Sequence, residues 1–184
     1  MKIFDPSIHL SLSKQNIHLD EFVFLDIEAS GLDFDSFPIE VAFANSNGDK
    51  ATYLIKPTYD WQEDGQWDTG AELTIHHISL DDLLTHGDSA KDVAIALNSA
   101  LQGKLILCND LAYDGVWLAK LFKAADVGVA FFLTDISAYF EFVGEEAKQR
   151  FKSAYDAIPV TTIHRALPDA ERFVAAYMAI SHEG

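Results

Sequence analysis

The sequence predicts an α/β sandwich built around a mixed sheet, rather than a repeated nucleotide-binding fold. Three observations predict this class. Apolar patterns typical of strands and helices follow one another in the order β-β-β-α-β-α-β-α. The first three strand-like runs are joined by short connections, as in an antiparallel meander. The sequence contains neither G-x-G-x-x-G nor a P-loop, so nothing in it indicates a nucleotide cofactor.

The chain has 184 residues, 49% of them hydrophobic, which is enough for one domain with a sizeable core. It shows no internal repeat and no Pro/Gly-rich linker, which predicts a single domain over 1–184 with 1–19 as an N-terminal extension. No apolar run reaches the length of a membrane span, and the start lacks a signal-peptide core. Cys108 is the only cysteine, which excludes an intramolecular disulfide. We therefore expect a cytoplasmic protein with no membrane partner.

The composition is strongly acidic, with 29 Asp and Glu against 13 Lys and Arg and a formal net charge of -16. Binding long nucleic acid over a broad basic surface needs many phosphate contacts, so this charge argues against a protein of that class. It leaves room for a site that holds a few phosphates through metal ions.

Five strands are predicted. The first three cover 21–29, 38–46 and 51–57, and the stretch NSNGDK between the second and third has the Asn and Gly of a hairpin turn. The fourth, at 104–109, is a short continuous apolar run of the kind found in buried strands. The fifth covers 129–136.

Helices are predicted where apolar side chains recur at helical spacing, and these segments are 88–101, 113–125, 137–157 and 169–180. Asp88 or Ser89 is predicted to be the N-cap of the first. The segment 58–70 is polar and predicts a loop.

Two carboxylates stand near the end of the first strand. Asp26 and Glu28 are two residues apart, so they point to the same face of a strand. Ionised carboxylates in apolar surroundings are costly unless they are paired or bound to a cation. Oxygen-only ligands suit hard cations such as Mg²⁺ or Mn²⁺. By itself, such a pair is weak evidence for a metal site, because most pairs of this kind are strand ends exposed to solvent.

Two further blocks carry acids at helix starts. In CNDLAYDG, a buried strand runs into a helix whose first turn carries Asp114. In HRALPDA, Pro168 fits the first position of the last helix, which places Asp169 in its first turn. His164 precedes Asp169 by five residues. Ordinary capping of helix termini explains each acid by itself.

Taken together, D-x-E on the first strand, Y-D after the fourth strand and H-x-x-x-x-D before the last helix resemble the DnaQ-like, DEDDh branch of the 3′–5′ exonucleases. The resemblance covers roughly residues 20 to 180. It implies an RNase H-like fold, with a central mixed five-stranded sheet and helices on both faces. The residues that it assigns to two divalent ions, Mg²⁺ or Mn²⁺, are Asp26, Glu28, Asp114 and Asp169. It assigns catalysis to His164, as general base, and to Glu28.

The chemistry that the resemblance implies is hydrolysis of phosphodiester bonds at the 3′ end of single-stranded DNA or RNA, which releases nucleoside 5′-monophosphates. Two ions about 4 Å apart activate a water and stabilise both the attacking and the leaving oxygen. A histidine, with a pKa near neutrality, takes the proton of that water. The alternative is a non-catalytic nucleic-acid or polymerase-associated module, and the intact acidic residues argue against it. A homodimer or a polymerase partner is left open.

The substrate-binding residues that the resemblance implies are Ala29, Ser30, Gly31, Leu32, His77, Ile78 and Tyr113. IHHISLDDL resembles the family segment H-G-I-[ST], with His77 in place of the glycine and Ile78 placed to pack on the terminal nucleotide. A short helix that packs on the core explains this block equally well. Leu32 is expected to act as a wedge or floor. Asp110 departs from the family pattern as an extra acid, which is expected to raise the pKa of neighbouring carboxyls or alter the metal preference.

Overall fold

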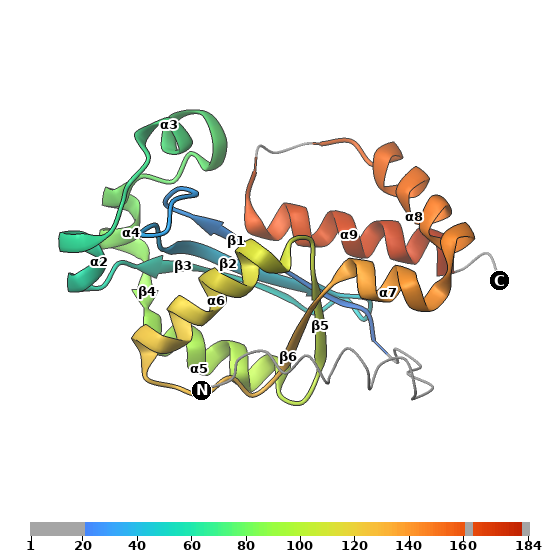
Figure 1. Ribbon diagram of the computed structural model, residues 1–184, viewed down its shortest axis with the longest axis horizontal. Helices are drawn as coiled ribbons and strands as arrows, with labels where there is room; N and C mark the ends of the chain where they lie inside the picture. The colour runs from blue at the N-terminus through green and yellow to red at the C-terminus, as the bar shows by residue number, and fades with distance from the viewer. Residues whose placement is uncertain (1–20, 161–163, 182–184) are drawn as a thin grey trace.

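The computed structural model describes residues 21–160 and 164–181 (Figure 1). The predicted N-terminal extension at 1–19 lies outside these residues. At the centre is a sheet of six strands in the order β4-β3-β2-β1-β5-β6. The strands are β1 (Val23–Ala29), β2 (Pro38–Asn45), β3 (Lys50–Lys56), β4 (Asp88–Ser89), β5 (Leu105–Cys108) and β6 (Phe132–Asp135). The predicted α/β class is confirmed, and the predicted strand count of five is one too few.

The additional strand is β4, whose two residues pair in parallel with the end of β3. A two-residue pairing leaves no apolar period in the sequence, which is why the segment was predicted only as a helix start. It is a helix start as well. The Ser89 hydroxyl accepts the backbone N–H of Asp92 and caps the helix that follows, so Ser89 is the N-cap.

The pairing of the strands is mixed, as predicted. β1, β2 and β3 form the antiparallel meander. In the turn between β2 and β3, Asn45 Oδ1 accepts the backbone N–H groups of Asn47 and Asp49, and Gly48 has a φ of +96°. β5 pairs in parallel with β1, and β6 with β5. Each of these parallel strands is reached through a helix that carries the chain back along the sheet.

The helical elements in the described residues are α2 (Tyr59–Asp64), α3 (Thr69–Ala71), the π-helical turn η1 (Glu72–His76), α4 (Leu80–His86), α5 (Ala90–Leu101), α6 (Leu111–Ala125), α7 (Ile136–Val143), α8 (Glu145–Ala157) and α9 (Ala166–Ser181). None of the helices in this part of the chain is long and apolar enough to cross a membrane.

Two of the helices differ from the predictions. The segment 58–70, predicted as a loop, contains α2, because the Thr58 hydroxyl accepts the Trp61 backbone N–H and caps it. The last helix begins at Ala166 rather than at 169. Pro168 is therefore its third residue rather than its first, where a missing N–H is still tolerated because the first turn lacks helical acceptors.

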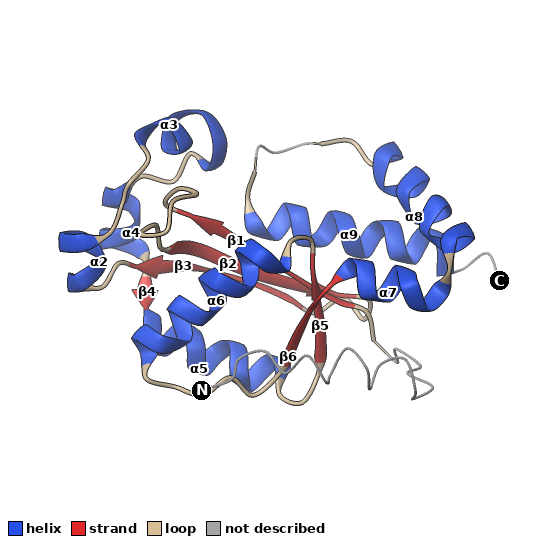
Figure 2. Cartoon of the chain, viewed as in Figure 1, coloured by secondary structure: helices blue, strands red, loops and turns tan. Residues whose placement is uncertain are grey.

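Side chains alternate along β1 and supply two apolar layers, one on each face of the sheet. Val23, Leu25 and Ile27 join a buried cluster with side chains of α5 and α6. Phe22 and Phe24 point to the opposite face and join a cluster with α7, α8 and α9. Figure 2 shows these last three helices grouped together. Helices therefore cover both faces, as the family resemblance implied.

Helix α9 packs along β1 through a ladder of aromatic pairs. The rings of Phe22 and Tyr177 stack with centroids 4.2 Å apart, and those of Phe24 and Phe173 with centroids 3.9 Å apart. Four helical residues advance about 6 Å and two strand residues about 6.6 Å, so successive pairs stay in step. The step beyond Phe24 and Phe173 carries carboxylates instead of rings.

Candidate active site

Three carboxylates meet where the aromatic ladder between β1 and α9 ends. Asp26 follows Phe24 on the α9 face of β1, and Glu28 follows Asp26 on the same face. Asp169 comes four residues before Phe173, in the first turn of α9. One possible ligand atom from each of the three acids lies within 4.8 Å of the others. The fold therefore brings three of the four predicted metal-binding acids into one group.

Asp114, the fourth predicted acid, lies beside this group. It is the fourth residue of α6, its side chain is 6% exposed, and its Oδ2 accepts the backbone N–H of Asp110 at 3.3 Å. Among the described residues, the group of ligand atoms within 4.8 Å does not include it. Its charge is nevertheless the largest of those that raise the pKa of Asp26, which makes the two carboxyls near neighbours.

Asp110, the extra acid in the second block, is the N-cap of α6. Its Oδ1 accepts the backbone N–H of Ala112 at 2.9 Å, so a local role accounts for it without a metal. Burial raises the pKa of Asp114; the backbone N–H of Asp110, which donates to Asp114, opposes this rise, and the charge of Asp110 adds to it by less.

The carboxyls of the site all have raised pKa values, and burial is the largest cause in each. Burial raises the pKa of Glu28 to about 7, with the charges of neighbouring acids adding to it and the charge of Arg165 opposing it. It raises the pKa of Asp114 to about 7 as well. The pKa of Asp26 is raised well above its usual value. Burial and mutual repulsion therefore disfavour full ionisation of these carboxyls at neutral pH.

A hard divalent cation fits this donor set. The grouped atoms are carboxylate oxygens, which are the ligands that Mg²⁺ and Mn²⁺ prefer. A bound cation would also remove the repulsion that raises the pKa values, because it supplies the missing counter-charge.

His164, the predicted general base, stands five residues before Asp169 with an exposed side chain. Burial raises the pKa of Asp169, and the charge of His164 opposes that rise. The backbone φ of His164 is +26°, in a region that L residues rarely adopt. Backbone strain of this kind is retained mainly at functional sites. The segment directly before it, 161–163, lies outside the described residues.

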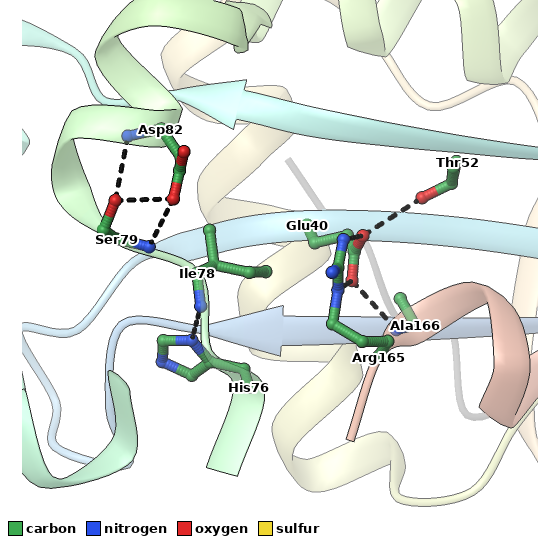
Figure 3. Close-up of polar contacts among 8 residues, drawn as sticks. All are labelled: Glu40, Thr52, His76, Ile78, Ser79, Asp82, Arg165 and Ala166. Atoms are coloured by element: carbon green, nitrogen blue, oxygen red, sulfur yellow. Dashed lines mark hydrogen bonds and ion pairs between the residues drawn. The ribbon is translucent and has the colours of Figure 1, made fainter. Parts of the chain in front are cut away.

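The start of α9 is fixed by an ion pair between the buried Glu40 and the partly exposed Arg165, which sequence reasoning missed (Figure 3). Arg165 donates from Nε to Glu40 Oε2 at 2.9 Å and from Nη2 to Oε1 at 2.6 Å. The backbone N–H of Ala166 donates to Glu40 Oε2 at 3.0 Å, and the Thr52 hydroxyl donates to Oε1 at 3.3 Å. Glu40 is 2% exposed and lies on β2 directly opposite Glu28. The available signal was an isolated acid within the apolar run PIEVAFAN.

The segment after β1 is held by its small residues. The Ser30 hydroxyl donates to the carbonyl oxygen of Gln66 at 2.6 Å and accepts the backbone N–H of Phe37 at 3.0 Å. At Gly31, an added Cβ would lie 3.0 Å from the Ser36 hydroxyl oxygen, which leaves no room for a larger residue without a shift. Ser30 and Gly31 therefore shape the loop that leaves the acidic strand end.

Two of the residues predicted to bind substrate have exposed side chains. Leu32 is 74% exposed, and Tyr113, from the first turn of α6, is 45% exposed. Ala29 is partly buried at the end of β1. The ammonium group of Lys120 on α6 donates to the carbonyl oxygen of Ser36 at 2.6 Å, which ties the loop to the helix.

In the segment I-H-H-I-S, the side chains of His76 and Ile78 are buried and that of His77 is exposed. His76 is 1% exposed, and its Nδ1 accepts the backbone N–H of Ile78 at 3.1 Å (Figure 3). Ile78 is 3% exposed and packs with Phe37 and Leu83, so little of its side chain is left to meet a nucleotide. His77 is exposed and has φ +54° and ψ +32°. This left-handed conformation is the one that glycine adopts without strain, and glycine is the family residue at this position.

No family model matches the sequence, and no curated protein matches it. Solved structures do match the fold. The zinc-bound form of E. coli exonuclease I with single-stranded DNA superposes with a TM-score of 0.66 and 17% identity, over 88% of this chain and 40% of that one. E. coli exonuclease I with a dA16 oligonucleotide gives a TM-score of 0.63 and 16% identity, over 86% and 40% of the two chains.

The Mopeia virus exonuclease domain matches with a TM-score of 0.50 and 20% identity, over 96% of this chain and 86% of that one. The chain thus spans about 40% of the length of the exonuclease I chains that it matches. At these identities the likeness establishes the fold. The chain shares its fold with these exonuclease structures, which confirms the RNase H-like fold class predicted from its sequence.

Proposed function

We propose that this protein is a metal-dependent 3′–5′ exonuclease that hydrolyses the terminal phosphodiester bond of single-stranded DNA or RNA. The observation that carries the proposal is the group of Asp26, Glu28 and Asp169, with Asp114 beside it, on an exonuclease fold. E. coli exonuclease I was solved with single-stranded DNA bound, which supports a single-stranded substrate.

We assign Asp26, Glu28, Asp114 and Asp169 to two divalent ions, Mg²⁺ or Mn²⁺. The bound ions would supply Lewis-acid polarisation of the phosphoryl group and neutralise the charge that develops at phosphorus. The Mopeia virus exonuclease domain was solved depleted of manganese, which supports Mn²⁺ as one of the candidates.

In this proposal, His164 accepts the proton that the attacking water loses, through a ring nitrogen. The water oxygen bonds to phosphorus as the bond from phosphorus to the preceding 3′ oxygen breaks. The nucleoside 5′-monophosphate leaves, and the freed 3′ oxygen takes a proton from solvent.

The substrate-binding residues stay predictions, and the structure makes some of them better candidates than others. The side chains of Leu32, Tyr113 and His77 are exposed, which supports them as candidates to contact the terminal nucleotide, and an apolar or aromatic surface can stack on any base. Ala29, Ser30 and Gly31 would act through backbone amides. A homodimer or a polymerase partner, and a cytoplasmic location, also stay predictions.

The deciding experiment is incubation with 3′-labelled and 5′-labelled single-stranded and double-stranded DNA and RNA, with Mg²⁺, Mn²⁺ or EDTA. We expect nucleoside 5′-monophosphates from the 3′ end, only in the presence of the metal. Asp26→Ala and Asp169→Ala should reduce release to the level of a blank without protein.

The matched control is Asp156→Ala, which removes an exposed acid of α8 that is not part of the group. It should retain wild-type release. Full activity of Asp26→Ala or Asp169→Ala would contradict the metal assignment. Wild-type protein that binds the oligonucleotides without shortening any of them would favour the non-catalytic module instead.

A further inference from the structure

The strongest polar contact around the site does not involve any of the predicted catalytic residues. The Glu40 carboxylate receives both arms of the Arg165 guanidinium and the backbone N–H of Ala166. Two-point bonding of this kind fixes orientation as well as distance. Figure 3 shows the pair spanning from β2 to the first residue of α9. The contact joins positions that are 125 residues apart in the sequence.

The place of this contact in the chain matters, because Arg165 stands between the two parts of the H-x-x-x-x-D block. His164 is the residue directly before Arg165, and the backbone N–H of Asp169 donates to the Arg165 carbonyl oxygen at 3.1 Å. Glu40 therefore fixes the backbone at Arg165, which lies directly after His164 and four residues before Asp169.

Glu40 is also a carboxylate that the site could otherwise use. It lies directly opposite Glu28 in the β1–β2 register, so the two side chains leave neighbouring strands side by side. Both of its oxygens are already occupied by donors from Arg165, Ala166 and Thr52. A carboxylate held in this way is a support for the ligands and not one of them.

We propose that Arg165 and Glu40 form a positioning pair, which sets the start of α9 so that His164 and Asp169 both face the carboxylates of β1. Only the measurements of kcat and KM depend on the proposed exonuclease function; the measurements of Mn²⁺ affinity and Tm do not. Neither residue touches the substrate or the ions. Glu40 is 2% exposed, whereas the Arg165 side chain is 39% exposed, so the buried acid depends on the arginine for its counter-charge.

Three substitutions and one double substitution test the proposal. Arg165→Met removes the charge, Arg165→Lys keeps the charge without the two-armed geometry, and Glu40→Gln keeps an acceptor for Ala166 without the ion pair. The double variant with Glu40→Gln and Arg165→Met leaves no unpaired buried charge. For each, we would measure Mn²⁺ affinity by titration calorimetry, kcat and KM on a labelled oligonucleotide, and the Tm.

Loss of a residue that orients a metal ligand typically costs about 10-fold to 100-fold in metal affinity or activity. We expect Arg165→Met to weaken Mn²⁺ binding and lower kcat by about this factor, with KM changed much less. Arg165→Lys should recover only part of the Mn²⁺ affinity and of kcat, because the ammonium group of a lysine cannot make the two parallel hydrogen bonds of a guanidinium. The Tm should fall in both single Arg165 variants.

The double variant separates positioning from simple stabilisation. Removing both partners relieves the unpaired buried charge, so the Tm should return toward that of the wild type. Mn²⁺ affinity and kcat should stay low, because the two-point contact with Arg165 is gone and only the hydrogen bond from Ala166 is left to hold the start of α9. Recovery of Mn²⁺ affinity and kcat together with the Tm would overturn the proposal, and so would wild-type values of both in Arg165→Met.

A control ion pair joins the neighbouring strand β3 to the same helix. Lys50 and Glu171 form an exposed ion pair at 2.5 Å that also joins the sheet to α9. Lys50→Met and Glu171→Gln should leave Mn²⁺ affinity and kcat unchanged, since exposed pairs contribute little. If the wild type hydrolyses no substrate, the proposed function fails while the Mn²⁺ titrations still decide the positioning pair. If the wild type is active and Arg165→Met equals it, only the positioning pair fails.

Discussion

The contact between β1 and α9 has two ends with the same geometry and opposite chemistry. At one end, Phe22 stacks on Tyr177 and Phe24 stacks on Phe173. At the other end, the next step of the ladder carries carboxylates whose pKa values are raised by burial and by one another. Four residues of the helix span nearly the same distance as two residues of the strand along the whole contact. The two ends therefore differ only in their side chains.

The comparison shows that the aromatic pairs stabilise the contact between β1 and α9, whereas the grouped carboxylates destabilise it. Stacked rings release apolar surface from water and keep the two elements in register. Grouped carboxylates in the same setting repel each other and are costly to ionise. The register that the rings impose is therefore what holds the acids close enough to share a cation.

The largest expected effect comes from breaking the aromatic end. Phe24→Ala removes a side chain that is fully buried and should lower the free energy of unfolding by about 3–5 kcal/mol. Denaturant unfolding would measure it. Phe142→Ala is the control, because Phe142 is 58% exposed and should change stability by less than about 1 kcal/mol. Equal losses in the two variants would show that the ladder is not part of the core.

The acidic end should make the metal-free protein sensitive to pH. The folded pKa of Glu28 is about 7 against an ordinary 4.5, and that of Asp114 about 7 against 3.8. Acids with raised folded pKa values contribute stability that is fully present below the unfolded pKa and is lost as pH rises through the folded one. Stability without metal should therefore fall by a few kcal/mol between about pH 4 and pH 7, as followed by urea unfolding in EDTA.

Adding Mn²⁺ should restore the stability lost at the upper end of this pH range, since an ion that binds only the folded state stabilises it. A metal-free stability that is flat, or that rises, over the same range would contradict the raised pKa values. The test is independent of any nuclease activity.

A smaller effect of opposite sign is expected from neutralising one acid. Asp26→Asn removes a buried charge that its neighbours disfavour, so it should stabilise the metal-free protein at pH 8 by about 0.5–2 kcal/mol. The same substitution should abolish hydrolysis and weaken Mn²⁺ binding. Thermal unfolding and Mn²⁺ titration of one preparation would show both results. A Tm in EDTA that is lower for Asp26→Asn than for the wild type would count against repulsion at this end.

The smallest effect lies beyond the acidic end, at the exposed His77. His77→Gly should stabilise the protein by about 1 kcal/mol, because it removes the cost of a left-handed backbone conformation. Asp126→Gly is the matched control, since Asp126 has a φ of +52° at the end of α6. If the imidazole of His77 contacts the substrate, only His77→Gly should also raise KM, and an unchanged KM would remove His77 from the substrate-binding residues.

Much of the fold could be predicted because its longer elements carry strong periodicity. The meander of β1 to β3 and the helices α5 and α6 are defined by apolar spacing and by turn residues such as Asn45 and Gly48. β4 and α2 were missed because two paired residues, or six residues capped by Thr58, leave too short a pattern.

The site could be predicted in part for a similar reason. Asp26 and Glu28 are indicated by strand spacing, and Asp169 by its place at a helix start, so their meeting could be predicted once the family pattern was seen. The pairing of Glu40 with Arg165 could not, because it joins residues 125 positions apart and no local period links them. Burial of Ile78 was equally invisible, since it depends on how Ile78 packs with Phe37 and Leu83.

The buried thiol of Cys108 provides a way to measure local opening of the structure near the site. Cys108 is the only cysteine of the chain, is fully buried at the end of β5, and its thiol donates to the Thr134 carbonyl oxygen on β6 at 3.4 Å. Burial raises the pKa of this thiol, which suppresses the reactive thiolate. A thiol reagent should therefore modify only molecules in which the structure around β5 has opened. Because the chain continues from Cys108 into the helix that carries Asp114, the rate of labelling measures how often that half of the acidic site comes apart.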